Sequence, residues 1–130
     1  AAYRVSHIWL SGATPLPSHA KVARTAMGTD RYVSWSFCEK VEDALNEINE
    51  SGFSLLGIEL SEGASPMFEI SIPQKTCLVF GHEDRGLSST VLESCESVAF
   101  IPQLGRVGSL NVATAAGIAL YEAHRRLWIP

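Results

Sequence analysis

The sequence predicts one α/β domain with a mainly parallel sheet and helices on both of its faces. Short β-prone apolar runs alternate with helical segments, and no repeat, low-complexity tract or linker divides the 130 residues. This length and the 46% apolar content suit a single domain over residues 1–130. Strand–loop–helix units place their loops at the carboxyl ends of the strands, which is the edge where such sheets bind ligands.

The first third of the chain is expected to hold two strands with a short helix between them. The apolar run Val5–Leu10 predicts a strand that ends in a turn at Gly12. A short helix over Lys21–Met27 should stop at Gly28. Tyr32–Trp35 is expected to form a second, partly exposed strand.

The middle of the chain carries the clearest helical pattern. Apolar residues of Val41–Asn49 recur three, four and seven positions apart with acids between them, which predicts an amphipathic helix closed by Gly52. Phe53–Leu60 and Thr76–Phe80 then predict strands, joined by a loop over Ser61–Pro73 with at most a short strand piece.

The last third is expected to hold a helix, a strand and a longer helix. Ser88 is a suitable cap for a short helix that reaches about Ser94, and Ser97–Ile101 predicts the last strand. A long helix is expected from Ser109, acting as N-cap, to about Arg126. Beyond it, Trp128 could serve an interface.

Charge and cysteine content narrow the function classes. The net charge is −4, but residues 39–69 hold eight acids against Lys40 alone, so the remainder has an excess of three positive charges. This polarity fits an ordinary solvated acidic helix, and it also fits one face that is repelled by a polyanion while another approaches it.

Cys38, Cys77 and Cys95 form no C-x-x-C pair, which disfavours a disulfide framework and a zinc site and favours the cytoplasm. No apolar run reaches the ~20 residues of a membrane span, and the histidines lack metal-ligand spacing, so neither membrane nor metal is expected.

A first glycine-rich loop follows the strand Thr76–Phe80. Gly81 and Gly86 free the backbone to turn sharply and approach a ligand, while Glu83 and Arg85 between them could order the loop or meet a polar ligand. A plain glycine turn with surface charges explains the pattern too. The spacing matches neither a dinucleotide fingerprint nor a phosphate loop.

A second glycine-rich loop, residues 102–108, leads into the final helix. Arg106 lies between its glycines, and Ser109 and Asn111 stand where the helix starts. Free backbone N–H groups and the positive end of the helix dipole would favour a carboxylate or phosphate there. Capping alone explains both residues as well. The small side chains over Ala113–Ala119 permit close packing against a loop, the sheet or an identical subunit.

Together, the two loops resemble motifs 2 and 3 of the SpoU (TrmH-like) family of RNA ribose methyltransferases in the SPOUT superfamily. Gly-x-Glu-x-x-Gly-Leu begins at Gly81, and Ile-Pro followed by Ser-Leu-Asn-Val begins at Ile101, which is a specific pair. Residues 12–35 also resemble the family's segment after its first motif, so the likeness covers essentially the whole chain. Gln103 and Ala113 stand where the family often has Met and Ser.

This resemblance implies a C-terminal trefoil knot that holds S-adenosylmethionine. The cofactor-binding residues that it implies are Gly81, Glu83, Gly86, Ile101, Pro102 and Leu110. The catalytic residues that it implies are Ser109, Asn111 and Glu83. Arg85 and Arg106 are candidates for contacts with RNA phosphates, although surface solubility explains them equally well.

The resemblance further implies methyl transfer to a ribose 2′-hydroxyl of tRNA or rRNA by a homodimer packed partly through the last helix. The family's first motif, with an arginine that helps to activate the hydroxyl, would lie just before Ala1, with the first strand and helix. Because that arginine is absent, the sequence leaves open whether this piece is active by itself. The alternative is a non-catalytic SPOUT-like module that binds RNA or a protein.

Overall fold

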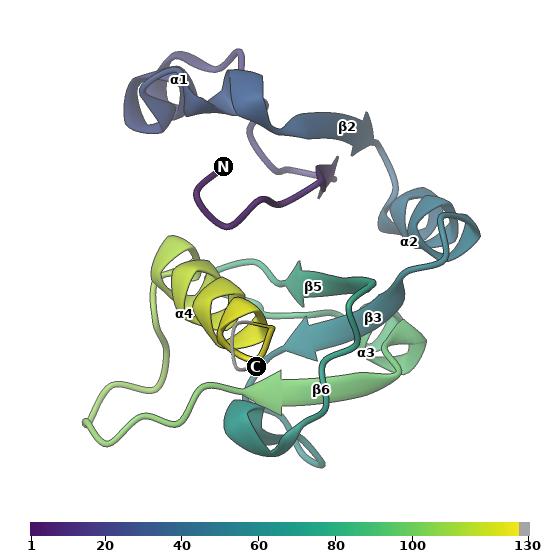
Figure 1. Cartoon of the computed structure of the whole chain (residues 1–130), viewed down its shortest axis with the longest axis vertical. Helices are drawn as coiled ribbons and strands as arrows, with labels where there is room; N and C mark the ends of the chain where they lie inside the picture. The colour runs from purple at the N-terminus through teal and green to yellow at the C-terminus, as the bar shows by residue number, and fades with distance from the viewer. Residues whose placement is uncertain (128–130) are drawn as a thin grey trace. The chain divides into compact units, whose positions relative to one another are not determined.

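The computed structural model describes residues 1–127, so Trp128 lies outside the described residues. The chain forms two compact units, Ala1–Glu47 and Ile48–Pro130. The first unit has a two-stranded sheet, β1-β2, and the second a four-stranded sheet in the order β4-β6-β3-β5. Figure 1 labels β6, β3 and β5 of the second sheet. All strand pairs of both sheets are parallel, which confirms the expected α/β class.

The first unit is a parallel strand pair with a helical connection. Its elements are β1 (His7–Ser11), α1 (Ala20–Ala26), the 3₁₀ helix η1 (Thr29–Tyr32) and β2 (Ser34–Cys38). The predicted strand Tyr32–Trp35 is wrong in its placement, because the Val33 amide bonds to the Asp30 carbonyl at 3.3 Å and closes η1. The chain becomes extended only after that turn, so the strand runs on to Cys38.

Helix α2 (Val41–Glu50) confirms the amphipathic prediction. Ala44, Leu45 and Ile48 are buried, whereas the acids between them are exposed. Burial of this apolar stripe is what stabilises so short a helix. Gly52, with φ of +77°, turns the chain out of the helix, as the sequence predicts.

The second unit places one strand at the centre of its sheet. Its elements are β3 (Ser54–Ile58), β4 (Ser65–Pro66), the 3₁₀ helix η2 (Met67–Glu69), β5 (Thr76–Phe80), α3 (Ser89–Ser94), β6 (Ser97–Phe100) and α4 (Val112–Arg125). Strand β3 pairs with β5 on one side and β6 on the other. The predicted cap of α3 is confirmed, since Ser88 Oγ accepts from the Val91 amide at 3.4 Å.

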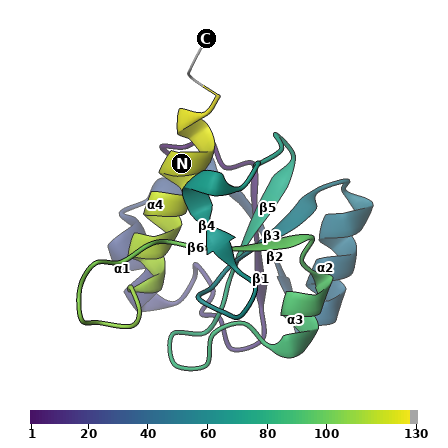
Figure 2. The same ribbon diagram turned by 90° about the horizontal axis from the view of Figure 1, so that it is seen from below.

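Side chains alternate across β3 and pack against helices on both sides of the sheet. Leu56 and Ile58 share a core cluster with Ala119 of α4. Gly57 faces the other way, because an added Cβ would lie 3.2 Å from both Cys95 Sγ and Leu87 Cδ1, which flank α3. Figure 2 shows α3 and α4 on opposite sides of this sheet.

The connection after β3 crosses strand β6. Ile58 at the end of β3 and Ser65 at the start of β4 both pair with Ala99, from opposite sides of β6. Residues 59–64 therefore pass from one side of β6 to the other within a single short segment. The chain then returns to the far edge of the sheet to form β5.

The N-cap of α4 is Asn111, so the prediction that Ser109 caps this helix is wrong. Asn111 Oδ1 accepts from the amides of Ala113 and Thr114 at 3.0 and 3.3 Å. Asparagine and serine are about equally good caps, and a helix that starts at Val112 buries Ala119 in the core. Within residues 1–127, no helix combines the length and the apolar character that crossing a membrane requires.

Candidate functional site

Three loops of the second unit leave the same edge of its sheet. Glu59, Gly81 and Ile101 directly follow β3, β5 and β6, whose parallel pairing brings their carboxyl ends to one edge. The Glu59 amide donates to the Ala99 carbonyl at 2.9 Å, which fixes the start of the first of these loops. This is the edge where the sequence predicts a ligand site.

The loop after β5 is closed on itself and requires both of its glycines. The His82 amide donates to the Gly86 carbonyl at 3.2 Å, and the Gly86 amide donates to the His82 carbonyl at 2.7 Å. Gly86 has a φ of +65°, in the left-handed region that favours glycine. A Cβ on Gly81 would overlap the Gly86–Leu87 peptide. The expected close backbone approach is thus built into this loop.

A carboxylate that sequence reasoning missed also holds the loop. Glu59 Oε2 accepts from the Leu87 amide at 3.0 Å, and a Cβ on Gly86 would stand 2.5 Å from the same oxygen. Glu59 is half-buried. The predicted strand Phe53–Leu60 includes Glu59, but β3 ends at Ile58, so this acid stands at the start of a loop.

Asn111 joins the two glycine-rich loops. Its Nδ2 donates to Glu83 Oε1 at 3.2 Å, while its Oδ1 caps α4. The expectation of free N–H groups at this helix start is therefore wrong for Ala113 and Thr114, whose amides are taken by the cap.

The structure brings together Gly81, Glu83, Gly86 and Asn111 from the predicted set. Ile101 and Leu110 are half-buried and flank the second loop, while Pro102 is exposed within it. Ser109, Arg85 and Arg106 are exposed, and the hydrogen bonds described above do not include them. The roles assigned to these last three residues remain predictions.

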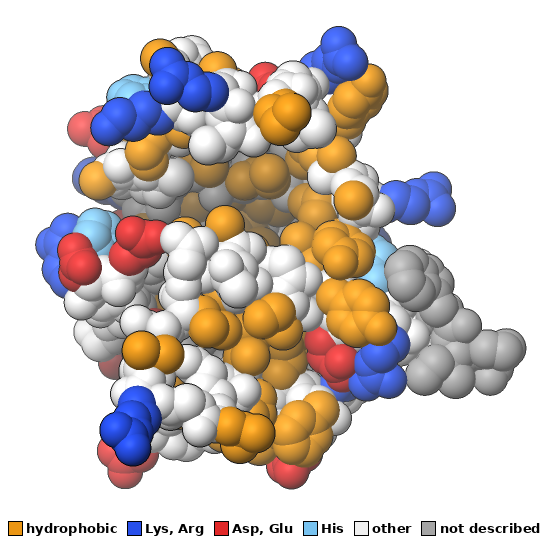
Figure 3. All heavy atoms as spheres, turned by 90° about the vertical axis from the view of Figure 1, so that its left-hand side faces the viewer, with side chains coloured by type: hydrophobic (Ala, Val, Ile, Leu, Met, Phe, Trp, Pro, Cys, Tyr) orange, Lys and Arg blue, Asp and Glu red, His pale blue; other side chains and the backbone are white. Residues whose placement is uncertain are grey.

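Charge is dispersed over the surface drawn in Figure 3. Lys and Arg side chains stand singly or in small groups among acidic ones on this face. Among residues 1–127, no group of three or more His, Cys, Asp or Glu side chains could hold a metal ion. The structure therefore assigns no metal position.

The thiols are poor nucleophiles. Burial raises the pKa of Cys77 to about 11, with a further contribution from Cys95. Burial also raises the pKa values of Cys38 and Cys95. Since the thiolate is the reactive form, these residues do not suggest cysteine chemistry.

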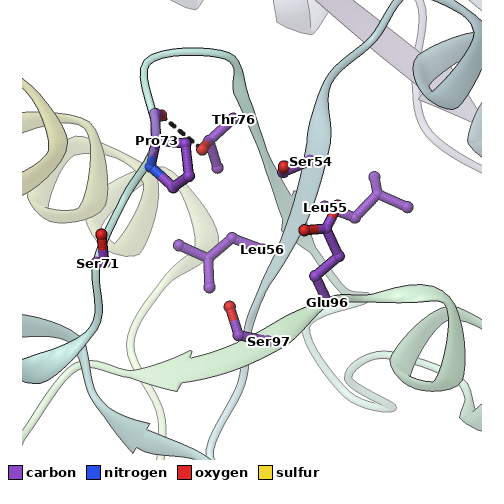
Figure 4. A pocket seen from close by; sticks show the side chains of 8 residues that line it. All are labelled: Ser54, Leu55, Leu56, Ser71, Pro73, Thr76, Glu96 and Ser97. Atoms are coloured by element: carbon purple, nitrogen blue, oxygen red, sulfur yellow. Dashed lines mark hydrogen bonds between the residues drawn. The ribbon is translucent and has the colours of Figure 1, made fainter.

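A cavity of about 190 Å³ lies at the opposite edge of the same sheet. Ser54, Thr76 and Ser97, which begin β3, β5 and β6, line it together with Ser71 and Glu96 (Figure 4). The Thr76 hydroxyl donates a hydrogen bond to the Pro73 carbonyl, with 2.6 Å between the two oxygens. The cavity is separate from the loops at the carboxyl edge, where the predicted residues converge.

The family model of the SpoU rRNA methylase family matches residues 1–121. The chain belongs to this family. Among curated relatives, an uncharacterized tRNA/rRNA methyltransferase of Synechocystis is 34% identical over 128 residues, covering 98% of this chain and 46% of the relative. The tRNA (guanosine(18)-2′-O)-methyltransferase of Escherichia coli is 31% identical over 105 residues, covering 81% of this chain and 46% of the enzyme. The SpoU chain thus spans about half the length of these relatives.

Solved structures of RNA-modifying enzymes share the fold. An rRNA methyltransferase of Sinorhizobium meliloti, solved with bound AdoMet, aligns with a TM-score of 0.89 and 31% identity over 97% of this chain and 48% of that one. A TrmH/SpoU tRNA-modifying enzyme of Aquifex aeolicus aligns with a TM-score of 0.82 and 29% identity over 96% of this chain and 63% of that one. These matches confirm the family resemblance that the two loop motifs predicted.

Proposed function

We propose that the SpoU chain supplies the cofactor-binding part of an enzyme that methylates ribose 2′-hydroxyls of tRNA or rRNA with S-adenosylmethionine. The observation that carries the proposal is the Asn111–Glu83 hydrogen bond, which joins the two family motifs at the carboxyl edge of one sheet. Relatives named as tRNA and 23S rRNA 2′-O-methyltransferases support the substrate class.

The residues at this edge fit the cofactor. Gly81 and Gly86 let the backbone of this loop pack against itself and against Glu59, because an added Cβ at either position would overlap these atoms. Gln103 Oε1 is buried and has no hydrogen-bond partner within residues 1–127, so an acceptor is left over for a ligand donor. Backbone groups of Gly81, Ile101 and Leu110 would hold the cofactor, with Gly86 shaping the turn and Pro102 stiffening the second loop.

The cofactor, when bound, supplies an electrophilic methyl group on a sulfonium sulfur. Transfer forms an O–CH₃ bond and breaks the S–CH₃ bond, so the sulfur leaves as a neutral thioether. The hydroxyl proton would pass to a base supplied by the family's first motif, and the residues of this chain have to align the ribose oxygen. We assign alignment of the ribose to Ser109, which is exposed beside the start of α4, and to Asn111. Glu83 is the catalytic carboxylate of the set, and Asn111 holds it in place at 3.2 Å.

RNA binding is assigned to Arg85 and Arg106, because both are exposed on the two loops. We also propose that the enzyme is a cytoplasmic homodimer packed partly through α4. Ile118 and Tyr121, 40% and 48% exposed on that helix, support an apolar contact. The family match over residues 1–121 includes residues of both compact units, which supports a single methyltransferase catalytic domain over residues 1–130.

We further propose that the second unit is knotted. Support comes from residues 59–64 crossing β6 and from Arg126, which donates to the carbonyls of Met67 and Ile70 and so ties the end of α4 to the returning chain. Mechanical unfolding tests this directly. A knotted chain extends to less than the ~3.6 Å per residue of an open one, and full extension would refute the knot.

Methyl transfer and cofactor affinity test the function together. Incubation of the whole protein with tritiated S-adenosylmethionine and undermethylated tRNA or rRNA should label the RNA, and Asn111→Ala should abolish the label. Calorimetry should show that the SpoU chain binds the cofactor. Binding without methyl transfer would favour the non-catalytic RNA- or protein-binding module, and no binding would refute the proposed cofactor site.

A further inference from the structure

One half-buried carboxylate of the second unit is left unused by the proposed mechanism. Glu59 follows β3, whose last four residues are buried, and its side chain turns back to the loop after β5. A carboxylate loses solvation when it is half-buried, so its position needs a specific hydrogen-bond partner. That partner is the amide of Leu87.

The Gly86–Leu87 peptide is held from both of its ends. Its carbonyl accepts from the His82 amide at 3.2 Å, and its N–H donates to Glu59 Oε2 at 3.0 Å. A peptide plane fixed in this way cannot rotate without breaking both hydrogen bonds. Without the carboxylate, the Leu87 N–H would lose its partner, and one of the two hydrogen bonds that hold this peptide would be gone.

The same peptide packs directly against Gly81. A Cβ on Gly81 would overlap the Gly86 carbonyl carbon and oxygen and the Leu87 nitrogen. On the other side, a Cβ on Gly86 would meet Glu59 Oε2 at 2.5 Å. The peptide therefore lies between Gly81 and the Glu59 carboxylate, so a movement of Glu59 is transmitted to the backbone of Gly81.

We propose that Glu59 is a positioning residue that fixes the Gly86–Leu87 peptide, and through it the backbone of Gly81, in the shape that binds the cofactor. This inference rests on the proposed function, because Gly81 is one of the residues assigned to S-adenosylmethionine. Glu59 acts at one side of the loop and Asn111, through Glu83, at the other. The loop is thus fixed before a ligand arrives, which lowers the ordering cost of binding.

The test compares three substitutions at Glu59 in the full chain. Glu59→Gln keeps an acceptor oxygen at the same reach, Glu59→Asp keeps the charge but shortens the side chain, and Glu59→Leu removes the acceptor. Calorimetry should show a Kd for S-adenosylmethionine within about threefold of the wild type for Gln, and weaker by about tenfold or more for Leu, with Asp between them. Glu62→Leu, an exposed acid after the same strand, is the matched control and should leave the Kd unchanged.

Hydrogen exchange of the Leu87 amide, measured by NMR, separates positioning from general destabilisation. It should accelerate at least tenfold in Glu59→Leu, and remain slow in Glu59→Gln and Glu62→Leu, while the amides of β3 and β5 keep their protection. If Glu59→Leu does not fold, Glu59→Asp carries the same comparison with a smaller expected change. Unchanged Leu87 exchange, or an unchanged Kd despite faster exchange, would overturn the proposal.

Failure of the proposed function would look different. A wild-type chain that does not bind S-adenosylmethionine would refute the cofactor site itself, and with it the role of Glu59 in binding. The Leu87 exchange rates would still decide whether Glu59 fixes the peptide.

Discussion

The carboxamide of Asn111 serves two loops at once: Nδ2 donates to Glu83 Oε1 at 3.2 Å, and Oδ1 accepts from the amides of Ala113 and Thr114. One side chain thereby caps α4 and fixes a carboxylate that lies 28 positions earlier in the sequence. Because Oδ1 caps the helix and Nδ2 binds Glu83, substitutions of Asn111 can separate the two roles.

Asn111→Asp should keep the N-cap of α4 and lose the hydrogen bond to Glu83. Aspartate is as good an N-cap as asparagine, so the free energy of unfolding should stay within ~0.5 kcal/mol, whereas Asn111→Ala should cost about 1 kcal/mol. In Asn111→Asp two carboxylates face each other, and S-adenosylmethionine affinity should fall by roughly tenfold. Denaturant unfolding and calorimetry measure the two effects.

The double variant Asn111→Asp with Glu83→Gln is the matched control for the hydrogen bond between these two residues. It exchanges donor and acceptor, so cofactor affinity should recover only in part, because Glu83 is itself a proposed cofactor contact. Methyl transfer should not return, because Glu83 is also the proposed catalytic carboxylate. Ser109→Ala, two positions before the cap, should change the unfolding free energy by less than ~0.5 kcal/mol. A large loss of stability in Ser109→Ala would contradict the assignment of Asn111 as N-cap.

Gly81→Ala should distort the loop after β5 and weaken cofactor binding. The added methyl group would overlap the Gly86–Leu87 peptide, so the loop must open and cofactor affinity should fall by at least about tenfold. Gly105→Ala is the control, because an added Cβ there meets nothing within 4 Å. Equal affinities of the two variants, measured by calorimetry, would contradict the close approach at Gly81.

The sequence predicted the features that depend on local pattern. The spacing of apolar residues defined α2, Ser88 was recognised as the cap of α3, and alternating elements indicated parallel strands. The choice between Ser109 and Asn111 as the cap of α4 was not predictable locally, because both residue types cap well. The hydrogen bond from Leu87 to Glu59 joins residues 28 positions apart, and no periodicity reports such a contact.

Arg85 and Arg106 should contribute to RNA affinity in a salt-dependent way. Each phosphate contact that is lost should weaken binding at low salt and reduce the slope of log K against log salt by roughly 0.7–0.9. Lys75→Gln is the control, because Lys75 precedes β5 at the opposite edge of the sheet. Filter binding of tRNA over a salt series measures the slopes, and equal slopes for Arg106→Gln and Lys75→Gln would remove Arg106 from the interface.

The three thiols should resist alkylation in the folded protein. At pH 8, a pKa of about 11 leaves Cys77 with a thiolate fraction of only about one in a thousand, and burial raises the pKa values of Cys38 and Cys95 as well. Iodoacetamide followed by mass spectrometry should show slow labelling until denaturant is added. Rapid labelling of Cys77 in the native protein would show that it is more accessible than in this structure.

The end of α4 should make stability depend on pH through Glu122. Hydrogen bonds from Arg125 at 2.7 Å, and then from Arg126, hold the pKa of Glu122 below its ordinary value of 4.5, against the opposing effect of burial. A lowered folded-state pKa stabilises the protein above the unfolded-state value, and this contribution is lost as the pH falls through the folded-state pKa. Glu122→Gln should therefore be less stable than the wild type at pH 7, by about 1 kcal/mol, and the two should converge as the pH falls below 4.5. Glu93→Gln, at an exposed position of α3, should show no such convergence, and a pH-independent difference for Glu122→Gln would mean that lost packing rather than lost charge explains its effect.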